Sequence, residues 1–121
     1  MQIKNRNCRV DISKEKGILT VRLSGEIDHH SAVGIRSEID AMIAELRPER
    51  LALDLSGIDF MDSSGIGLIM GRYARMKAVG GELVVERPNA RIRKIFEMAG
   101  LERIVRIEEK KEGEKNEGKG N

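Results

Sequence analysis

The spacing of apolar residues changes along this chain of 121 residues, and that change limits the possible folds more than any other feature. Apolar and polar residues alternate over residues 8–12 and again over residues 19–23. A period of two is typical of half-buried strands, so we predict two strands joined by a polar turn at residues 13–17. From Ser31 the apolar residues recur at steps of three and four, which predicts an amphipathic helix that Pro48 ends.

The rest of the chain repeats a pattern of strand followed by helix. Residues 51–55 form a short apolar run suited to a central parallel strand, and residues 82–85 form another. Helices are predicted from about Ser63 to the glycine pair at 80–81, and over residues 89–99. A short strand over residues 104–107 closes the pattern. The stripe predicted to be buried on the second helix consists of Ile66, Ile69, Met70, Tyr73 and Met76.

The predicted order of elements is therefore ββαβαβαβ. Alternating strands and helices favour the α/β class, with a mixed β-sheet, parallel crossovers and helices packed on the sheet. One Tyr and two Phe are the only aromatic residues, so the core must be aliphatic. Gly100 is predicted to end the third helix in a left-handed conformation, with Leu101 folded back on Phe96.

We expect a single domain over residues 1–107. Residues 108–121 contain no apolar side chain. A segment that buries nothing cannot offset the entropy lost on ordering, so it is predicted to be a disordered, charged tail.

Composition and charge argue against several classes of protein. The chain has 22 basic and 20 acidic residues, and a net charge of +2 gives no broad field for nucleic acid or an anionic membrane. No apolar stretch is long enough to span a bilayer, and the polar N-terminus is unlike a signal peptide. The single Cys8 cannot form an internal disulfide. We expect a cytoplasmic protein with no cofactor, no metal, no nucleic-acid partner and no membrane partner.

One candidate site lies where the predicted central strand leads into the second helix. This junction falls at the carboxyl edge of the sheet, where α/β proteins usually place their sites. Asp62, Ser63 and Ser64 are all good N-cap residues, and Gly65 keeps the first turn uncrowded. The N–H groups and dipole of a helix start favour negative charge, so a phosphate on a serine here would be tolerated. The simpler interpretation is that these residues only cap a helix.

A second polar cluster runs from Gly25 to His30 and is interpreted as a loop before the first helix. Asp28, His29 and His30 invite a metal or acid–base hypothesis. However, adjacent residues point in different directions, and no further metal ligand occurs at a characteristic spacing. We favour polar residues that face solvent or a partner.

A nucleophilic serine is less well supported. The hydrolase elbow needs Gly-x-Ser-x-Gly, and neither Ser63 nor Ser64 has glycine two positions before it. A small serine hydrolase that uses His29 or His30 as base is a distant alternative, because the serines and histidines belong to different segments. We therefore expect no enzymatic activity.

The predicted second helix also carries an apolar residue off its stripe. Leu68 stands beside Gly67 and Gly71, which leave a bare ridge of backbone. Such a residue can mark a docking surface, but a helix covered on two sides is the commoner explanation.

Together, these segments resemble the STAS domain of bacterial anti-sigma-factor antagonists, most closely the sporulation type that opposes the anti-sigma-F kinase. The stretches that carry the resemblance are GEIDHHSA (25–32), FMDSSGIGLIMGRYARMKAVGGELVV (60–85) and IRKIFEMAGLERIVRI (92–107). The Asp-Ser-Ser-Gly box at residues 62–65 is the most specific element. The double histidine and Gly71-Arg72-Tyr73 favour the sporulation branch over the general-stress branch.

The resemblance implies that the protein regulates transcription by partner switching. In that family the first serine of the box, here Ser63, is phosphorylated by a partner that is both anti-sigma factor and serine kinase. The unphosphorylated protein binds this kinase and releases sigma factor, phosphorylation blocks binding, and a PP2C-type phosphatase resets the system. A STAS scaffold module in a stress-signalling or transporter-associated complex is the alternative. The expected partner-binding residues are Gly25, Asp28, His29, His30, Asp62, Ser63, Ser64, Gly65, Ile66 and Leu68.

Overall fold

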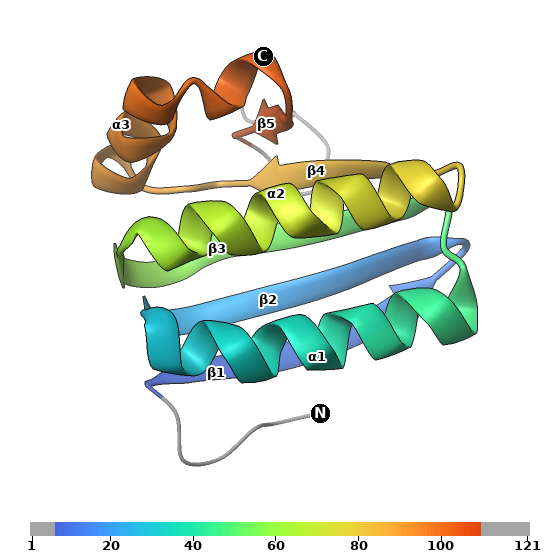
Figure 1. Cartoon of the computed structure of the whole chain (residues 1–121). Coiled ribbons are helices and arrows are strands. Elements are labelled where there is room, and N and C mark those ends of the chain that lie inside the picture. The colour runs from blue at the N-terminus through green and yellow to red at the C-terminus, as the bar shows by residue number, and fades with distance from the viewer. Residues whose placement is uncertain (1–6, 110–121) are drawn as a thin grey trace, which may run out of the picture.

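The computed structural model describes residues 7–109, which form one mixed β-sheet and its helices (Figure 1). The order ββαβαβαβ predicted from the spacing of apolar residues is confirmed. The elements are β1 (Cys8–Glu15), β2 (Ile18–Ile27), α1 (His29–Leu46), β3 (Arg50–Met61), α2 (Ser63–Ala78), β4 (Glu82–Glu86), α3 (Ala90–Ala99), a 3₁₀ turn (Leu101–Arg103) and β5 (Arg106–Glu108).

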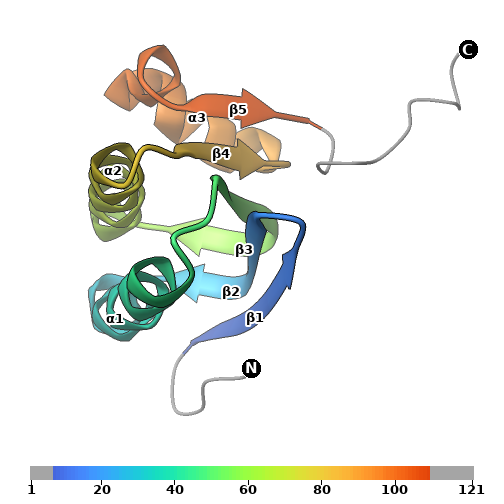
Figure 2. The ribbon, with the colours of Figure 1, turned by 90° about the vertical axis from the view of Figure 1, so that its right-hand side faces the viewer.

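The five strands lie in the sheet in the same order as in the sequence. β1 and β2 form an antiparallel hairpin, and every later pair is parallel. Each parallel pair is joined through a helix. α1 and α2 lie side by side on one face of the sheet, and α3 lies beyond the carboxyl end of β4 (Figures 1 and 2). The predicted α/β class, with a mixed sheet and parallel crossovers, is therefore confirmed.

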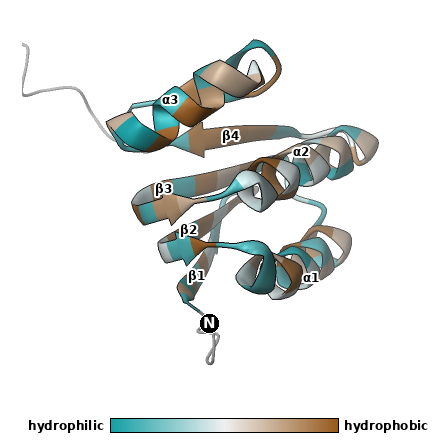
Figure 3. Cartoon of the chain, turned by 60° about the vertical axis from the view of Figure 1, so that its left-hand side comes forward, coloured by the Kyte–Doolittle hydropathy of each residue, from teal (hydrophilic) through white to brown (hydrophobic). Residues whose placement is uncertain are grey.

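The core is aliphatic, as the composition predicts. Leu51, Leu53 and Leu55 of β3 are fully buried and belong to one cluster with the buried side chains of the helices. Figure 3 shows the apolar colour concentrated along β3 and β4, while the helices carry both colours. Phe96 is the only aromatic side chain in the buried core of residues 7–109. Cys8, 1% exposed, is one more apolar member of that core.

Three predicted boundaries near the sheet are wrong. The first hairpin turns on two residues, Lys16 and Gly17, because both adopt the positive φ (52° and 82°) that a tight hairpin turn needs. β3 continues to Met61, well past residue 55, because β2 pairs with it over that length. α1 begins at His29 rather than at Ser31. The segment interpreted as a loop is therefore mostly strand and helix.

The predicted end of the third helix is confirmed, because Gly100 is the left-handed C-cap of α3. Gly100 has a φ of 73°, and its N–H donates to the carbonyl oxygens of Phe96 and Glu97. The predicted strand over 104–107 is partly wrong: a 3₁₀ turn intervenes, and β5 covers Arg106–Glu108. Of the predicted tail, Glu108 pairs with β4, and residues 110–121 lie outside the described residues. No helix in residues 7–109 is long and apolar enough to cross a membrane.

The predicted stripe on α2 is also partly wrong. Ile66, Met70 and Tyr73 are only partly buried against the core. α2 packs against α1 as well as the sheet, and this turns its buried face toward the neighbouring helix. The side chains and glycine buried on α2 are Gly65, Leu68, Ile69, Arg72 and Met76.

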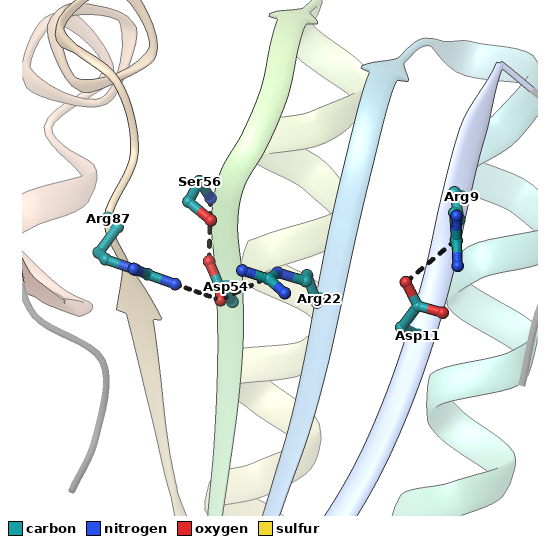
Figure 4. A network of polar contacts seen from close by, with 6 residues as sticks. All are labelled: Arg9, Asp11, Arg22, Asp54, Ser56 and Arg87. Carbon is teal, nitrogen blue, oxygen red and sulfur yellow. Dashed lines mark hydrogen bonds and ion pairs between the residues drawn. The ribbon is translucent and has the colours of Figure 1, made fainter. Parts of the chain in front are cut away.

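The sheet face opposite α1 and α2 carries a buried carboxylate (Figure 4). The side chain of Asp54 on β3 is 1% exposed, and its Oδ1 accepts the N–H of Ser56 at 3.0 Å. Its Oδ2 lies 2.9 Å from Nη2 of Arg87 and 3.5 Å from Nε of Arg22. Burial by itself raises the pKa of Asp54. The hydrogen bonds from Ser56 and the charge of Arg87 outweigh burial, so the pKa lies below its usual value.

We expect Asp54→Asn to lower the free energy of unfolding at neutral pH by about 1 to 3 kcal/mol, because two guanidinium groups lose their carboxylate. The folded-state pKa is below the unfolded-state pKa. Ionised Asp54 therefore stabilises the fold above a pH of about 3.9, and this contribution is lost as pH falls through the folded-state pKa. Urea unfolding of both proteins from neutral to acid pH should give a difference that shrinks in acid.

Asp11→Asn is the matched control for this prediction. Asp11 pairs with Arg9, and the two side chains are 42% and 59% exposed, respectively. Loss of this exposed ion pair should change stability by less than about 1 kcal/mol. A difference between wild type and Asp54→Asn that stays constant from neutral to acid pH would contradict the assignment.

Candidate functional site

The carboxyl ends of β2 and β3 bring the two predicted polar clusters together. Ile27 lies opposite Met61 in the parallel register, and the N–H of Asp62 donates to the carbonyl oxygen of Ile27 at 3.1 Å. Each strand is followed by an aspartate N-cap, Asp28 before α1 and Asp62 before α2. Two helix N-termini therefore share one edge of the sheet, where their N–H groups and dipoles favour negative charge.

Asp28 caps α1 by a reciprocal arrangement. Its carboxylate accepts the N–H of Ser31 at 2.8 Å, and its own N–H donates to the Ser31 hydroxyl at 3.0 Å. The side-chain amide of Asn7 donates to the other carboxylate oxygen at 3.2 Å. The hydrogen bond from the Ser31 backbone is the main cause that lowers the pKa of Asp28. The spacing Asp-x-x-Ser was a signal for this cap that the sequence analysis missed.

The two adjacent serines at the start of α2 differ in their surroundings. The carboxylate of Asp62 accepts both the N–H of Ser64 (2.8 Å) and the Ser64 hydroxyl. Ser64 is half-buried, and its hydroxyl is committed to this cap. Ser63 is exposed, and its hydroxyl makes no hydrogen bond to any residue in the described range 7–109. Of the pair, Ser63 has the accessible hydroxyl.

Three predicted partner-binding residues of α2 are wholly or partly buried. A Cβ at Gly65 would collide with the side chain of Met61, so glycine lets the first turn of α2 lie on the end of β3. Ile66 is half-buried against the core, and Leu68 is 4% exposed. Leu68 therefore fits the expected alternative of a helix covered on two sides. Their role in partner binding stays a prediction.

The remaining predicted residues divide into two groups. His29 and His30 are exposed in the first turn of α1, beside the start of α2. Gly25 lies further back in β2, opposite Ile58. It has a φ of 104°, and a Cβ there would collide with the carbonyl oxygen of Asn7. The structure thus does not bring Gly25 to the helix starts, although Gly25 makes room for the segment that carries Asn7.

Hydrogen bonds within residues 7–109 give no support to the serine hydrolase alternative. Within residues 7–109 no hydrogen bond joins His29 or His30 to a serine hydroxyl, and the Ser64 hydroxyl donates to a carboxylate instead. A nucleophile needs a base within hydrogen-bond reach. The same part of the chain has no group of three His, Cys, Asp or Glu side chains placed to hold a metal ion.

An ion pair between a buried arginine and a partly buried aspartate joins α1 to α2. Arg72 has a side chain 5% exposed, with Nε 2.8 Å from Oδ1 of Asp40 and Nη2 3.3 Å from Oδ2. Its Nη1 donates to the carbonyl oxygen of Leu68 at 3.2 Å. Burial lowers the pKa of Arg72. In the sequence, Arg72 stands out only as part of the Gly71-Arg72-Tyr73 motif, because its partner Asp40 lies 32 residues away.

Comparison with known proteins decides the family. The sequence matches the family model described as STAS domain over residues 9–113. The chain belongs to the STAS domain family. This STAS domain is 39% identical over 101 residues to the anti-sigma F factor antagonist of Paenibacillus polymyxa, covering 84% of this chain and 86% of that protein. It is 33% identical over 107 residues to the anti-sigma-B factor antagonist of Bacillus subtilis (strain 168), covering 88% of this chain and 96% of that protein.

Solved structures agree with the sequence comparison. SpoIIAA, an anti-sigma factor antagonist, in its unphosphorylated form superposes with a TM-score of 0.73 at 30% identity, covering 81% of this chain and 86% of that one. Its phosphorylated form gives a TM-score of 0.66, also at 30% identity, covering 81% of this chain and 89% of that one. The predicted resemblance to anti-sigma-factor antagonists is confirmed.

We expect Arg72→Met to lower the free energy of unfolding of this STAS domain by about 3 kcal/mol, because it leaves Asp40 without its close partner. Arg72→Lys should recover only part of the loss, since an ammonium cannot make two parallel contacts. Arg75→Met is the control: Arg75 is 55% exposed and 3.7 Å from Asp40, so its loss should cost less than about 1 kcal/mol. Denaturant unfolding measures all three, and an unchanged Arg72→Met protein would refute the role.

Proposed function

We propose that this STAS domain is an anti-sigma-factor antagonist switched by phosphorylation of Ser63. Unphosphorylated, it binds an anti-sigma factor that is also a serine kinase, and sigma factor is released. The kinase transfers a phosphate to the Ser63 hydroxyl, the complex separates, and a PP2C-type phosphatase restores the hydroxyl. The cytoplasmic location expected from the sequence belongs to the same proposal, because these partners act on transcription.

The accessible Ser63 hydroxyl is the observation that carries the proposal. It stands at the N-terminus of α2, exposed and without a hydrogen bond to the described residues. Its neighbour Ser64 is tied to Asp62. In the proposed site, Asp62 and Ser64 keep the helix start in place while Ser63 faces the kinase.

The relatives support the same class of function. Two forms of SpoIIAA, unphosphorylated and phosphorylated, have been solved, and both share this fold at 30% identity. The identity of 39% to an anti-sigma F factor antagonist, against 33% to an anti-sigma-B factor antagonist, favours the sporulation type.

Physical chemistry separates two ways in which a phosphate on Ser63 could act. At a helix N-terminus a negative charge is favourable by about 0.3 to 1 kcal/mol, so phosphorylation should leave the domain folded. In a docking surface without a matched cation, the same dianion meets desolvation and like-charge repulsion. Mispaired charge at an interface costs roughly 2 to 5 kcal/mol, a weakening of about thirtyfold to several thousandfold. The cost at the interface is larger than the gain at the helix N-terminus. Phosphorylation of Ser63 therefore acts by preventing the kinase from binding, and not by unfolding the domain.

The first expected result concerns the site of modification. Incubation with ATP and the anti-sigma kinase of the same organism should add one phosphate, which intact mass and fragment mapping should locate on Ser63. Ser64→Ala is the matched control and should still gain one phosphate on Ser63, whereas Ser63→Ala should gain none. A phosphate on Ser64, or on wild type and Ser63→Ala alike, would refute the assignment.

The second expected result concerns binding. Ser63→Asp should bind the kinase more weakly than wild type, by about thirtyfold or more, because its charge mimics part of the phosphate. Its circular dichroism and unfolding midpoint should match wild type. Ser63→Ala should bind as wild type does and should not be released by ATP. If Ser63→Asp unfolds the domain, or binds normally in calorimetry, the blocked-interface mechanism is wrong.

A further inference from the structure

A hollow lies between α1 and α2, next to the start of α2. Its volume is about 240 Å³. Ser64 forms part of its wall, so the hollow begins one residue from Ser63. The residues that line it are His29, Ala32, Val33 and Arg36 from α1, and Ser64, Gly67 and Leu68 from α2.

The hollow has an apolar floor with room above it. Leu68 is 4% exposed and Ala32 is 9% exposed, while Val33 on the wall is 47% exposed. Gly67 is exposed, and a Cβ built there would meet no atom within 4 Å. Leu68 lines this hollow, whose volume can accept one aliphatic side chain.

The rim of the hollow carries the guanidinium of Arg36. Arg36 is exposed and makes no ion pair with any side chain in residues 7–109. One helical turn further on, Arg72 and Arg75 share the single carboxylate of Asp40. Burial lowers the pKa of Arg72, the carboxylate of Asp40 raises it in part, and the charges of Arg36 and Arg75 lower it further. The guanidinium of Arg36 therefore favours an acidic group on whatever binds in the hollow.

Geometry also favours a protein as the occupant. A pocket for a small molecule usually measures about 300 to 1,000 Å³, which is larger than this hollow. A standard protein interface covers about 800 Å² on each partner. A partner that covers Ser63 therefore also covers the hollow, which starts at the neighbouring residue. The ion pair between Arg72 and Asp40 joins the same two helices that enclose the hollow.

We propose that this hollow is the docking site for one aliphatic side chain of the anti-sigma factor, with a neighbouring Asp or Glu of that protein paired to Arg36. The inference rests on the proposed function. Ser63 and Gly67 are four residues apart and so lie on the same face of α2.

Filling the hollow tests the apolar contact. Calorimetry is done without ATP, so that the anti-sigma kinase cannot phosphorylate Ser63. Gly67→Leu should bind this kinase at least about tenfold more weakly than wild type, because the new side chain occupies the hollow. Leucine is a better helix former than glycine, so the domain stays folded. Ala78→Leu adds the same side chain to an exposed position of α2, about three turns away, and should bind within about twofold of wild type.

Reversing the charge tests the ion pair. Arg36→Glu should weaken binding by about tenfold at low salt, and by less at high salt because the interaction is screened. Arg91→Glu makes the same change of net charge on the exposed side of α3 and should bind within about twofold of wild type.

The outcomes separate this inference from the proposed function. If Ser63→Asp weakens binding but Gly67→Leu and Arg36→Glu bind like wild type, the docking site is refuted and the switch stands. If Gly67→Leu weakens binding no more than Ala78→Leu does, the docking site is refuted as well. If the wild-type protein does not bind the kinase, both proposals fail.

Discussion

Parallel pairing of β2 with β3 decides where the candidate functional site lies. Ile27 and Met61 stand opposite each other at the carboxyl ends of these strands, and the N–H of Asp62 extends the pairing by one more hydrogen bond of 3.1 Å. An aspartate cap and a helix follow each strand at once. Two helix N-termini and Ser63 are therefore neighbours because of strand register. A slip of one residue would turn the side chains of the strand to the other face of the sheet.

Two buried charges on opposite faces of the sheet fix how the other elements lie. Asp54 joins β2 and β3 to the segment after β4 through Arg22 and Arg87. Arg72 joins α2 to α1 through Asp40. A buried charge that loses its counter-ion destabilises the fold. Each of these charges therefore disfavours any packing of the elements that would separate it from its counter-ion. Asp54 and its two arginines link strands on the sheet face opposite α1 and α2. Arg72 and Asp40 link the two helices beside the candidate site.

Features controlled by nearby residues were predictable. Pro48 and Gly100 end their helices as expected, and Asp62 caps α2. The errors concern features that a distant segment controls. β3 is long because β2 pairs with it, and the buried face of α2 is turned because α1 packs beside it. The same packing buries Leu68, which the sequence pattern left between two interpretations.

By itself, the sequence determined the order of elements, the aliphatic core, the family resemblance and the serines at the start of α2, because periodicity, caps and motifs are local. Tertiary structure alone decided which charges are buried. It also decided that α1 and α2 enclose a hollow next to Ser63. The partners of Arg72 and Asp54 lie 32 and 33 residues away along the chain. No local pattern encodes such contacts, because they form only when the sheet brings distant segments together.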